Sequence, residues 1–184
     1  MATLQDYRDE RVRKLEELQT LGINPYPAKS NRTATAQQVV DEFAAREGQT
    51  VTVTGRIMGL RKFGKLAFIV LRDMSGQVQL FLHAPDVSEL DAPSGVLGMK
   101  QLNLLDTGDF IEATGEVIKT KTGEVSVGVA ELRLLTKALR PLPTELTNKE
   151  DRFRRRYVDM NVNIEVRELF VRRSKFGKAT REFM

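Results

Sequence analysis

LAFIVLRDMSGQVQLFLH, residues 66–83, reads as two strands joined by a tight turn. The segment 66–72 is rich in β-branched and aromatic residues, and the following Asp-Met-Ser-Gly is a turn signal. In 77–83, aliphatic residues alternate with glutamine, phenylalanine and histidine, which places Val78, Leu80 and Leu82 on one face of a strand. The stretch therefore predicts a β-hairpin whose aliphatic face lies in a core.

The same period of two recurs on both sides of this hairpin. Residues 51–58, 109–119 and 125–135 read as further strands, and the less regular segment 85–105 contains a helical pattern near 96–104. Five short strands with a helix between the third and the fourth is the order of an OB-fold barrel. The sequence does not decide whether the strands close into a barrel, because an open five-stranded sheet with the same strand order would give the same pattern.

Helical patterns flank the predicted strands. Apolar residues recur at helical spacing over 4–21, before Gly22, and a second short helix is expected over 35–46 with Thr35 as its N-cap. Helical periodicity returns after residue 147. The sequence thus predicts a mainly β fold with helices before and after the strands.

Two prolines divide the strands from the C-terminal helices. Pro141 and Pro143 end the barrel, since proline cannot donate to a sheet ladder. We therefore expect three parts: an N-terminal helical segment over 1–48, an OB-fold domain over 49–140, and a linker with helices over 141–184.

Composition excludes several classes of protein. The 184 residues are 41% hydrophobic and 29% charged, which is typical of a soluble globular protein. The chain has no cysteine, which excludes disulfides and thiolate catalysis and fits a cytoplasmic protein. No apolar run is long enough to span a membrane. We expect no metal site, and His83, the only histidine, carries no catalytic signature.

The positive charge is concentrated near the C-terminus. The segment from Arg152 to Arg181 contains ten Lys and Arg residues against three acidic residues, a local net charge of +7. The rest of the chain then sums to −3, because the total is +4. Net charge alone does not indicate that the central strands bind nucleic acid.

The second and third strands carry the first candidate binding residues. In an OB-fold this face and the adjoining loops hold oligonucleotides. Across the turn, Phe68 falls opposite or diagonal to Gln79, within reach of a cross-strand contact. An exposed aromatic ring can stack on a base, and an amide can pair with a base edge. The alternative is that Phe68 belongs to the core, because its strand is apolar on both faces.

Two basic segments carry the candidate phosphate contacts. The interval 56–72 holds five Lys and Arg residues, no acidic residue, and a predicted mobile loop between Gly59 and Gly64. In this loop and the tip at 119–124, phosphate contacts are expected from these lysines: Lys62, Lys65, Lys119 and Lys121. Glu124 can accept a hydrogen bond from a base N–H. The alternative for both segments is a solvated polar hairpin.

Five segments along the chain stand out: GINPYP (22–27), VTGR (53–56), KTKTGE (119–124), LLTKALRPLP (134–143) and RFRRRYVD (152–159). In this order they closely resemble class II lysyl-tRNA synthetases of the bacterial type. KTKTGE and LTKALRPLP are specific to that family, whereas RFRRRYVD is shared more loosely with aspartyl and asparaginyl relatives. The resemblance covers nearly the whole chain.

The resemblance implies an OB-fold that reads the uridine-rich anticodon of tRNA(Lys), followed by a catalytic domain that begins within 141–184. By the same resemblance, Phe68 stacks on the central uridine, Gln79 reads it, Arg61 is the basic loop residue and Glu124 the acidic residue of the last hairpin. Leu60 replaces a second basic residue that the family often has, and Phe176-Gly177-Lys178-Ala179 replaces a run of aliphatic residues.

The resemblance also implies a whole ligase that uses ATP and Mg²⁺ and forms a homodimer. The ATP-binding arginine motifs of the family do not occur in these 184 residues, so the chain by itself is expected to be inactive and to need no cofactor. Two alternatives remain: part of an aspartyl or asparaginyl synthetase, and a stand-alone OB-fold RNA-binding protein. KTKTGE and LTKALRPLP argue against the first alternative. The length of the source gene would distinguish the second, a stand-alone protein, from part of a lysyl-tRNA synthetase.

Overall fold

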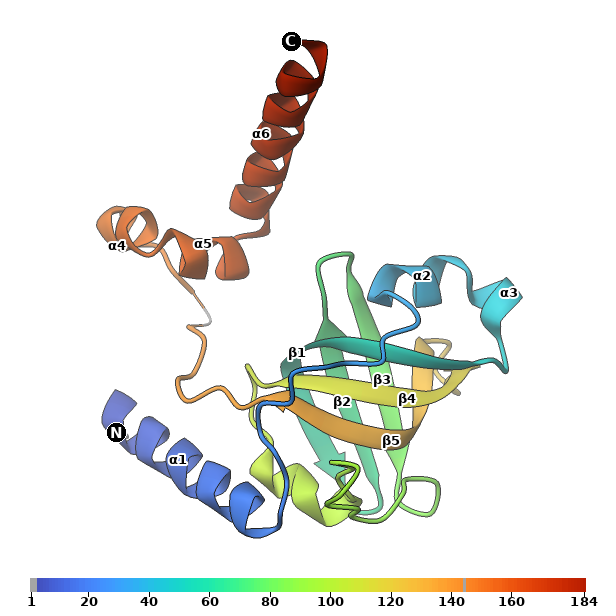
Figure 1. Cartoon of the computed structure of the whole chain (residues 1–184). Coiled ribbons are helices and arrows are strands. Elements are labelled where there is room, and N and C mark those ends of the chain that lie inside the picture. The colour runs from blue at the N-terminus through green and yellow to red at the C-terminus, as the bar shows by residue number, and fades with distance from the viewer. Residues whose placement is uncertain (1–2, 144) are drawn as a thin grey trace. The chain divides into compact units, whose positions relative to one another are not determined.

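The computed structural model describes residues 3–143 and 145–184 and divides the chain into two compact units, Met1–Pro141 and Leu142–Met184 (Figure 1). The first unit contains α1 (Leu4–Thr20), α2 (Ala36–Asp41), α3 (Phe43–Arg46), β1 (Thr50–Phe63), β2 (Leu66–Arg72), β3 (Gln77–His83), the 3₁₀ helix η1 (Met99–Leu104), β4 (Phe110–Lys119) and β5 (Val125–Thr136). The second unit contains α4 (Lys149–Arg154), α5 (Arg156–Val162) and α6 (Ile164–Phe183). The division into three parts stays a prediction.

The five strands form a closed barrel in the order β1-β2-β3-β5-β4. β1 closes one side because its first half pairs with β4 and its second half with β2, with a register shift between Ile57 and Gly59. β3 and β5 close the other side as a parallel pair. The predicted OB-fold, mainly β with flanking helices, is confirmed.

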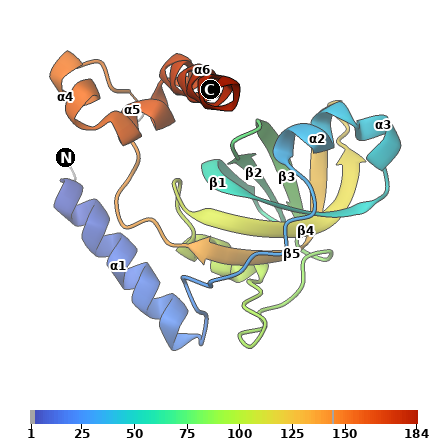
Figure 2. The same ribbon diagram turned by 45° about the horizontal axis from the view of Figure 1, so that its top comes forward.

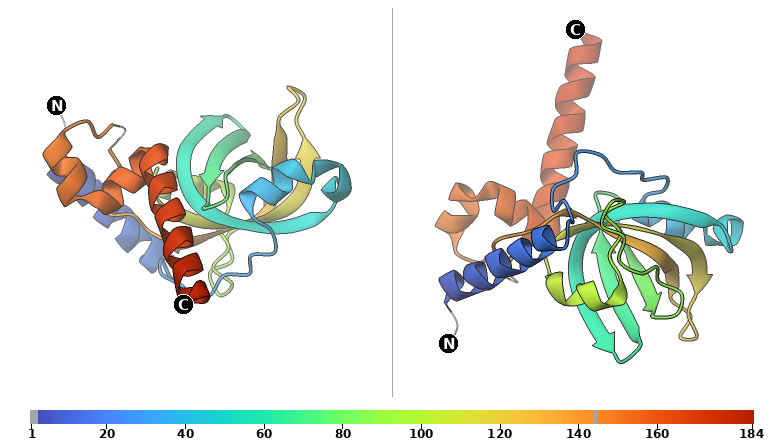
Figure 3. Two further views of the ribbon diagram at one scale, coloured as in Figure 1. Left: turned by 90° about the horizontal axis from the view of Figure 1, so that it is seen from above. Right: turned by 60° about the horizontal axis from the view of Figure 1, so that its bottom comes forward.

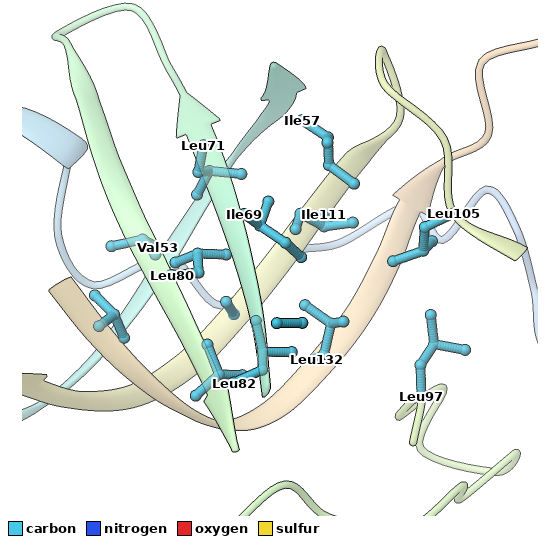
Figure 4. Close-up of a cluster of buried hydrophobic side chains, with 14 of the residues drawn as sticks. Val53, Ile57, Ile69, Leu71, Leu80, Leu82, Leu97, Leu105, Ile111 and Leu132 are labelled. Carbon is cyan, nitrogen blue, oxygen red and sulfur yellow. The ribbon is translucent and has the colours of Figure 1, made fainter. Parts of the chain in front are cut away.

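The barrel core comes from the alternation seen in the sequence. Val78, Leu80 and Leu82 of β3 are buried, as predicted. Leu80 and Leu82 lie in the barrel interior beside Ile69 and Leu71 of the adjacent strand β2 (Figure 4). Burying a side chain of this size contributes about 1.5–3 kcal/mol, so these rows supply a large part of the stability of the unit. The same alternation leaves the other side chains of both strands on the outer surface.

Three expected elements differ from the sequence prediction. β1 runs to Phe63, so residues 59–63 are paired with β2 and do not form a mobile loop. The predicted helix over 35–46 divides at Glu42 into α2 and α3, although Thr35 is the N-cap, as expected. The helix predicted near 96–104 is a 3₁₀ helix that begins at Met99.

In Figure 2, α1 lies beside the barrel. Hydrogen bonds from Arg11 and Lys14 attach it there. The Arg11 guanidinium is buried and donates hydrogen bonds of 2.8 Å and 2.9 Å to the carbonyl oxygens of Ala138 and Thr107. Lys14 contacts the Asp106 carboxylate at 2.7 Å, and the buried Lys137 contacts the same carboxylate at 2.6 Å. These bonds tie α1, the loop before β4 and the segment after β5 into one unit.

The second unit is organised around one buried carboxylate. Asp159 of α5 accepts hydrogen bonds from Arg152 (2.9 Å), Arg156 (2.7 Å) and Asn163 (2.6 Å), which join α4, α5 and the start of α6. No helix in the described part of the chain is long and apolar enough to cross a membrane.

Candidate nucleic-acid interface

The outer face of β1, β2 and β3 carries a row of side chains that the strand register sets side by side. Arg61 of β1 lies opposite Phe68 of β2, and Phe68 lies opposite Phe81 of β3. One step along, Gln79 lies opposite Val70, so Phe68 and Gln79 are diagonal neighbours on the same face. The diagonal arrangement was one of the two expected from the sequence.

Phe68 is half-buried and lies outside the barrel core. Its neighbours along the strand, Ala67 and Ile69, are fully buried, so the Phe68 ring projects to the opposite, outer face. The ring centroid lies 5.4 Å from that of Phe81 and 6.2 Å from that of Phe63, with interplanar angles of 50° and 69°. The three rings form an aromatic surface, which we call the phenylalanine row, and the core alternative for Phe68 is not supported.

Gln79 is held by a residue that the sequence did not single out. Its Nε2 donates a hydrogen bond of 3.0 Å to Oγ of Ser126, which is fully buried on the adjoining parallel strand β5. The Ser126 hydroxyl in turn donates weakly, at 3.4 Å, to the carbonyl oxygen of Glu124. This chain of bonds directs the amide nitrogen of Gln79 toward β5. The only hint in the sequence is a serine inside an apolar strand.

The basic residues near the β1–β2 turn separate onto two sides. Arg61 is exposed on the face of Phe68, and Lys65 is exposed at the turn itself. Lys62 projects to the other side of β1, where its Nζ lies 2.5 Å from Oδ1 of Asn103 in η1. Partial burial, together with the nearby Lys14, lowers the pKa of the Lys62 ammonium. Lys62 is therefore not brought together with Phe68, whereas Arg61 and Lys65 lie beside it.

The β4–β5 hairpin supplies the other predicted residues. Its tip is closed by hydrogen bonds between Thr120 and the backbone of Glu124, and Lys119, Lys121 and Glu124 are exposed. Glu124 precedes Ser126 by two residues, so the tip adjoins the Gln79 end of the face. This hairpin and the β1–β2 hairpin both extend from the barrel in the right-hand view of Figure 3. Arg61 and Lys65 thus border the phenylalanine row, whereas Nζ of Lys119 lies 6.0 Å from the ring centroid of Phe43 in α3.

A hollow of about 350 Å³ lies beside Phe81, over β3, β4 and β5. Its walls include Ile118, and the backbone of Gly128, which pairs with Phe81, forms part of the lining. Among the lining residues, Nδ1 of His83 lies 2.8 Å from the Asp86 carboxylate. A lining that combines apolar, aromatic and acidic side chains suits a base or a ring more than a phosphate.

The whole surface combines three kinds of contact that single-stranded RNA requires. Aromatic rings offer stacking, the fixed amide of Gln79 offers hydrogen bonds to a base edge, and the flanking Arg and Lys residues offer phosphate contacts. Within the described residues no group of three or more His, Asp or Glu side chains is placed to hold a metal ion. The roles of the individual residues stay predictions.

Comparisons with known proteins agree with this geometry. Residues 51–135 match the OB-fold nucleic acid binding domain of the tRNA anti-codon family. The lysine–tRNA ligases of Carboxydothermus hydrogenoformans and Clostridium novyi are each 42% identical to this chain over 95% of its length, and the enzyme of Clostridium acetobutylicum is 40% identical over all of it.

The chain spans about a third of the length of these relatives, between 34% and 35%. The resemblance to lysyl-tRNA synthetases drawn from the sequence motifs is confirmed. Nearly the whole chain is therefore similar to part of a lysine–tRNA ligase, and residues 51–135 match an OB-fold nucleic acid binding domain.

Proposed function

We propose that this chain binds the anticodon loop of tRNA(Lys), as the anticodon-recognising part of a lysine–tRNA ligase. The observation that carries the proposal is the outer face of β1–β3, where Phe68, Gln79 and Arg61 share one surface. The amide of Gln79 is anchored there by its hydrogen bond to Ser126. Phe68 stacks on the central base of the anticodon, Gln79 hydrogen-bonds its edge, and Arg61 contacts a neighbouring phosphate. Glu124 accepts from a base N–H at the β4–β5 end of the face.

The phosphate contacts are proposed for Lys65, Lys119 and Lys121, which are exposed beside the face. Lys62 supports the shape of the β1–β2 hairpin, because its ammonium donates a hydrogen bond to the side chain of Asn103. Each cation that neutralises a phosphate releases counterions on binding, so affinity should fall as salt rises.

For the whole ligase we propose attachment of lysine to tRNA(Lys) with ATP and Mg²⁺, a homodimeric assembly and a cytoplasmic location. The homology to lysine–tRNA ligases supports these proposals, and the lack of cysteine in this chain fits the last of them.

Binding of the 184-residue chain to RNA hairpins tests the proposal. Two anticodon stem-loops with identical stems are compared. One has a uridine-rich anticodon, and in the other the central uridine is replaced by cytidine. We expect tighter binding to the first, and an affinity for both that falls with salt. Equal affinities for the two loops would remove the anticodon reading and leave only non-specific RNA binding.

A further inference from the structure

Phe63 is the most exposed aromatic side chain on the candidate interface. It is the last residue of β1 and is 61% exposed, whereas Phe68 and Phe81 in the same row are half-buried. Its ring lies edge-on to Phe68, at 6.2 Å between centroids. The aromatic surface therefore continues past Phe68 to the end of the hairpin, where one ring is left open to solvent.

The hairpin holds Phe63 in place. Phe63 pairs with Leu66, and only Gly64 and Lys65 lie between the two strands. Gly64 has a φ of +58°, a conformation that glycine adopts without steric cost and that permits so tight a turn. A phenylalanine has few rotatable bonds, so a ligand that stacks on this ring would lose little conformational entropy.

We propose that Phe63 is a second stacking residue, which binds the nucleobase next in the RNA strand to the base on Phe68. The inference rests on the proposed function and extends it by one nucleotide. Exposed aromatic rings in a row bordered by cations are the arrangement on which successive bases of single-stranded nucleic acid stack. Arg61 stands two residues from Phe63 on the same face, and Lys65 lies in the turn that follows Phe63, so both can reach the phosphate that connects the two bases.

The geometry sets the conformation of the two bases. The rings of Phe63 and Phe68 are inclined by 69°, so one base cannot lie flat on both. Two bases that each lie flat on one ring are inclined to each other as well and do not stack together. The RNA must therefore be splayed at this step, and the base on Phe63 is held by its π face, without readout of its edge.

A double-mutant cycle between protein and RNA tests this contact. Phe63→Ala is combined with an abasic nucleotide placed on either side of the central base. We expect Phe63→Ala to weaken binding by about five-fold or more, the lower end of one base–aromatic stack. One of the two abasic loops should lose a similar factor, and the combination should lose little more than either change alone, because both remove the same contact.

A fluorescence experiment reports the stacking directly. The chain has no tryptophan, so Phe63→Trp introduces a single indole. We expect this variant to keep the affinity, and its fluorescence to be quenched by the intact loop but not by the loop that is abasic at the identified position. Phe63→Leu, which keeps an apolar side chain without a π face, should bind as weakly as Phe63→Ala.

Met74→Ala is the matched control, since Met74 is 74% exposed in the β2–β3 turn, at the other end of β2. Its affinity should equal that of the parent. Additive losses in the cycle, or full affinity of Phe63→Ala, overturn the inference. If Phe68→Ala still weakens binding in that case, the proposed function stands. If the parent chain binds no anticodon loop, both fail together.

Discussion

The side-chain amide of Gln79 donates a 3.0 Å hydrogen bond to the hydroxyl of Ser126 on the parallel strand β5. The Ser126 hydroxyl donates its own hydrogen bond to the carbonyl oxygen of Glu124. Its oxygen therefore accepts from Gln79 and holds the amide nitrogen on the β5 side. A free glutamine side chain can rotate and offer its donor and acceptor in either order. The anchored amide presents them in one order, which is the property that a reader of a base edge needs.

Removing the anchor should therefore lower selectivity more than affinity. In Ser126→Ala we expect the preference for a central uridine over cytidine to decrease, while binding to the uridine loop changes little. Folding stability should fall by about 0.5–1.5 kcal/mol, the net contribution of one hydrogen bond. The measurement is the ratio of the two dissociation constants, with Ser88→Ala, at an exposed serine, as the control. An unchanged ratio would mean that Ser126 does not contribute to the choice between uridine and cytidine.

Gln79→Ala removes the reader itself. We expect the same preference to be lost and the affinity for the uridine loop to fall, because the base edge loses its partner. Titrations with the uridine and the cytidine loops measure both effects. A loss of equal size for the two loops would contradict the assignment and leave Gln79 as a general contact.

Phe68→Ala separates a stacking residue from a core residue. We expect a loss of about 1–3 kcal/mol in affinity for the anticodon loop, about five- to 150-fold. Stability should fall by less than the about 3–5 kcal/mol of a buried phenylalanine, because the Phe68 ring lies on the outer face.

The control for Phe68 is a residue on the opposite face of the same hairpin. Leu80 is fully buried, and Leu80→Ala should cost about 2–5 kcal/mol of stability, with RNA binding intact in the folded fraction. Urea titrations and RNA titrations of both variants give the comparison. If Phe68→Ala unfolds as readily as Leu80→Ala and still binds RNA when folded, Phe68 is not the stacking residue.

The strands and their faces could be predicted from sequence because alternation is local. The aliphatic residues Val78, Leu80 and Leu82 occupy every second position of their strand. The turn after Arg72 places Phe68 near Gln79. Those signals depend on a few neighbouring residues only. They were sufficient for the fold and for the centre of the candidate site.

The remaining features depend on contacts between distant residues. The Ser126 partner of Gln79 requires the parallel pairing of β3 and β5, which no local pattern indicates. Lys62 was grouped with Arg61 because the segment looked like a loop. Once β1 is known to continue to Phe63, consecutive residues must point to opposite sides, and Lys62 turns toward Asn103.

Arg61 should account for part of the salt dependence of RNA binding. The slope of log affinity against log salt falls by about 0.7 for each phosphate contact on a single strand. We expect Arg61→Ala to flatten the slope by about that amount and Lys62→Ala to change it less, since the Lys62 ammonium already contacts Asn103. Titrations at four or more salt concentrations measure both slopes. A larger change for Lys62→Ala would reverse the two assignments.

The Lys14–Asp106 pair predicts how the stability of the first unit depends on pH. Burial alone would raise the pKa of Asp106, but hydrogen bonds from Lys137 and Lys14 outweigh it, and the pKa lies below the ordinary value of 3.8. A carboxylate with a lowered folded pKa stabilises the fold above its unfolded pKa, and that contribution disappears as the pH falls through the folded value.

Lys14→Met should therefore reduce the free energy of unfolding at pH 7. The difference from the parent should shrink as the pH falls below about 4 and vanish once Asp106 is protonated in both states. Urea titrations at a series of pH values between 7 and 2 measure it, with Lys29→Met, at an exposed lysine, as the control. A difference that stays constant over this range would mean that Lys14 acts through the packing of its aliphatic stem, because the ion pair with Asp106 titrates over this range and apolar packing does not.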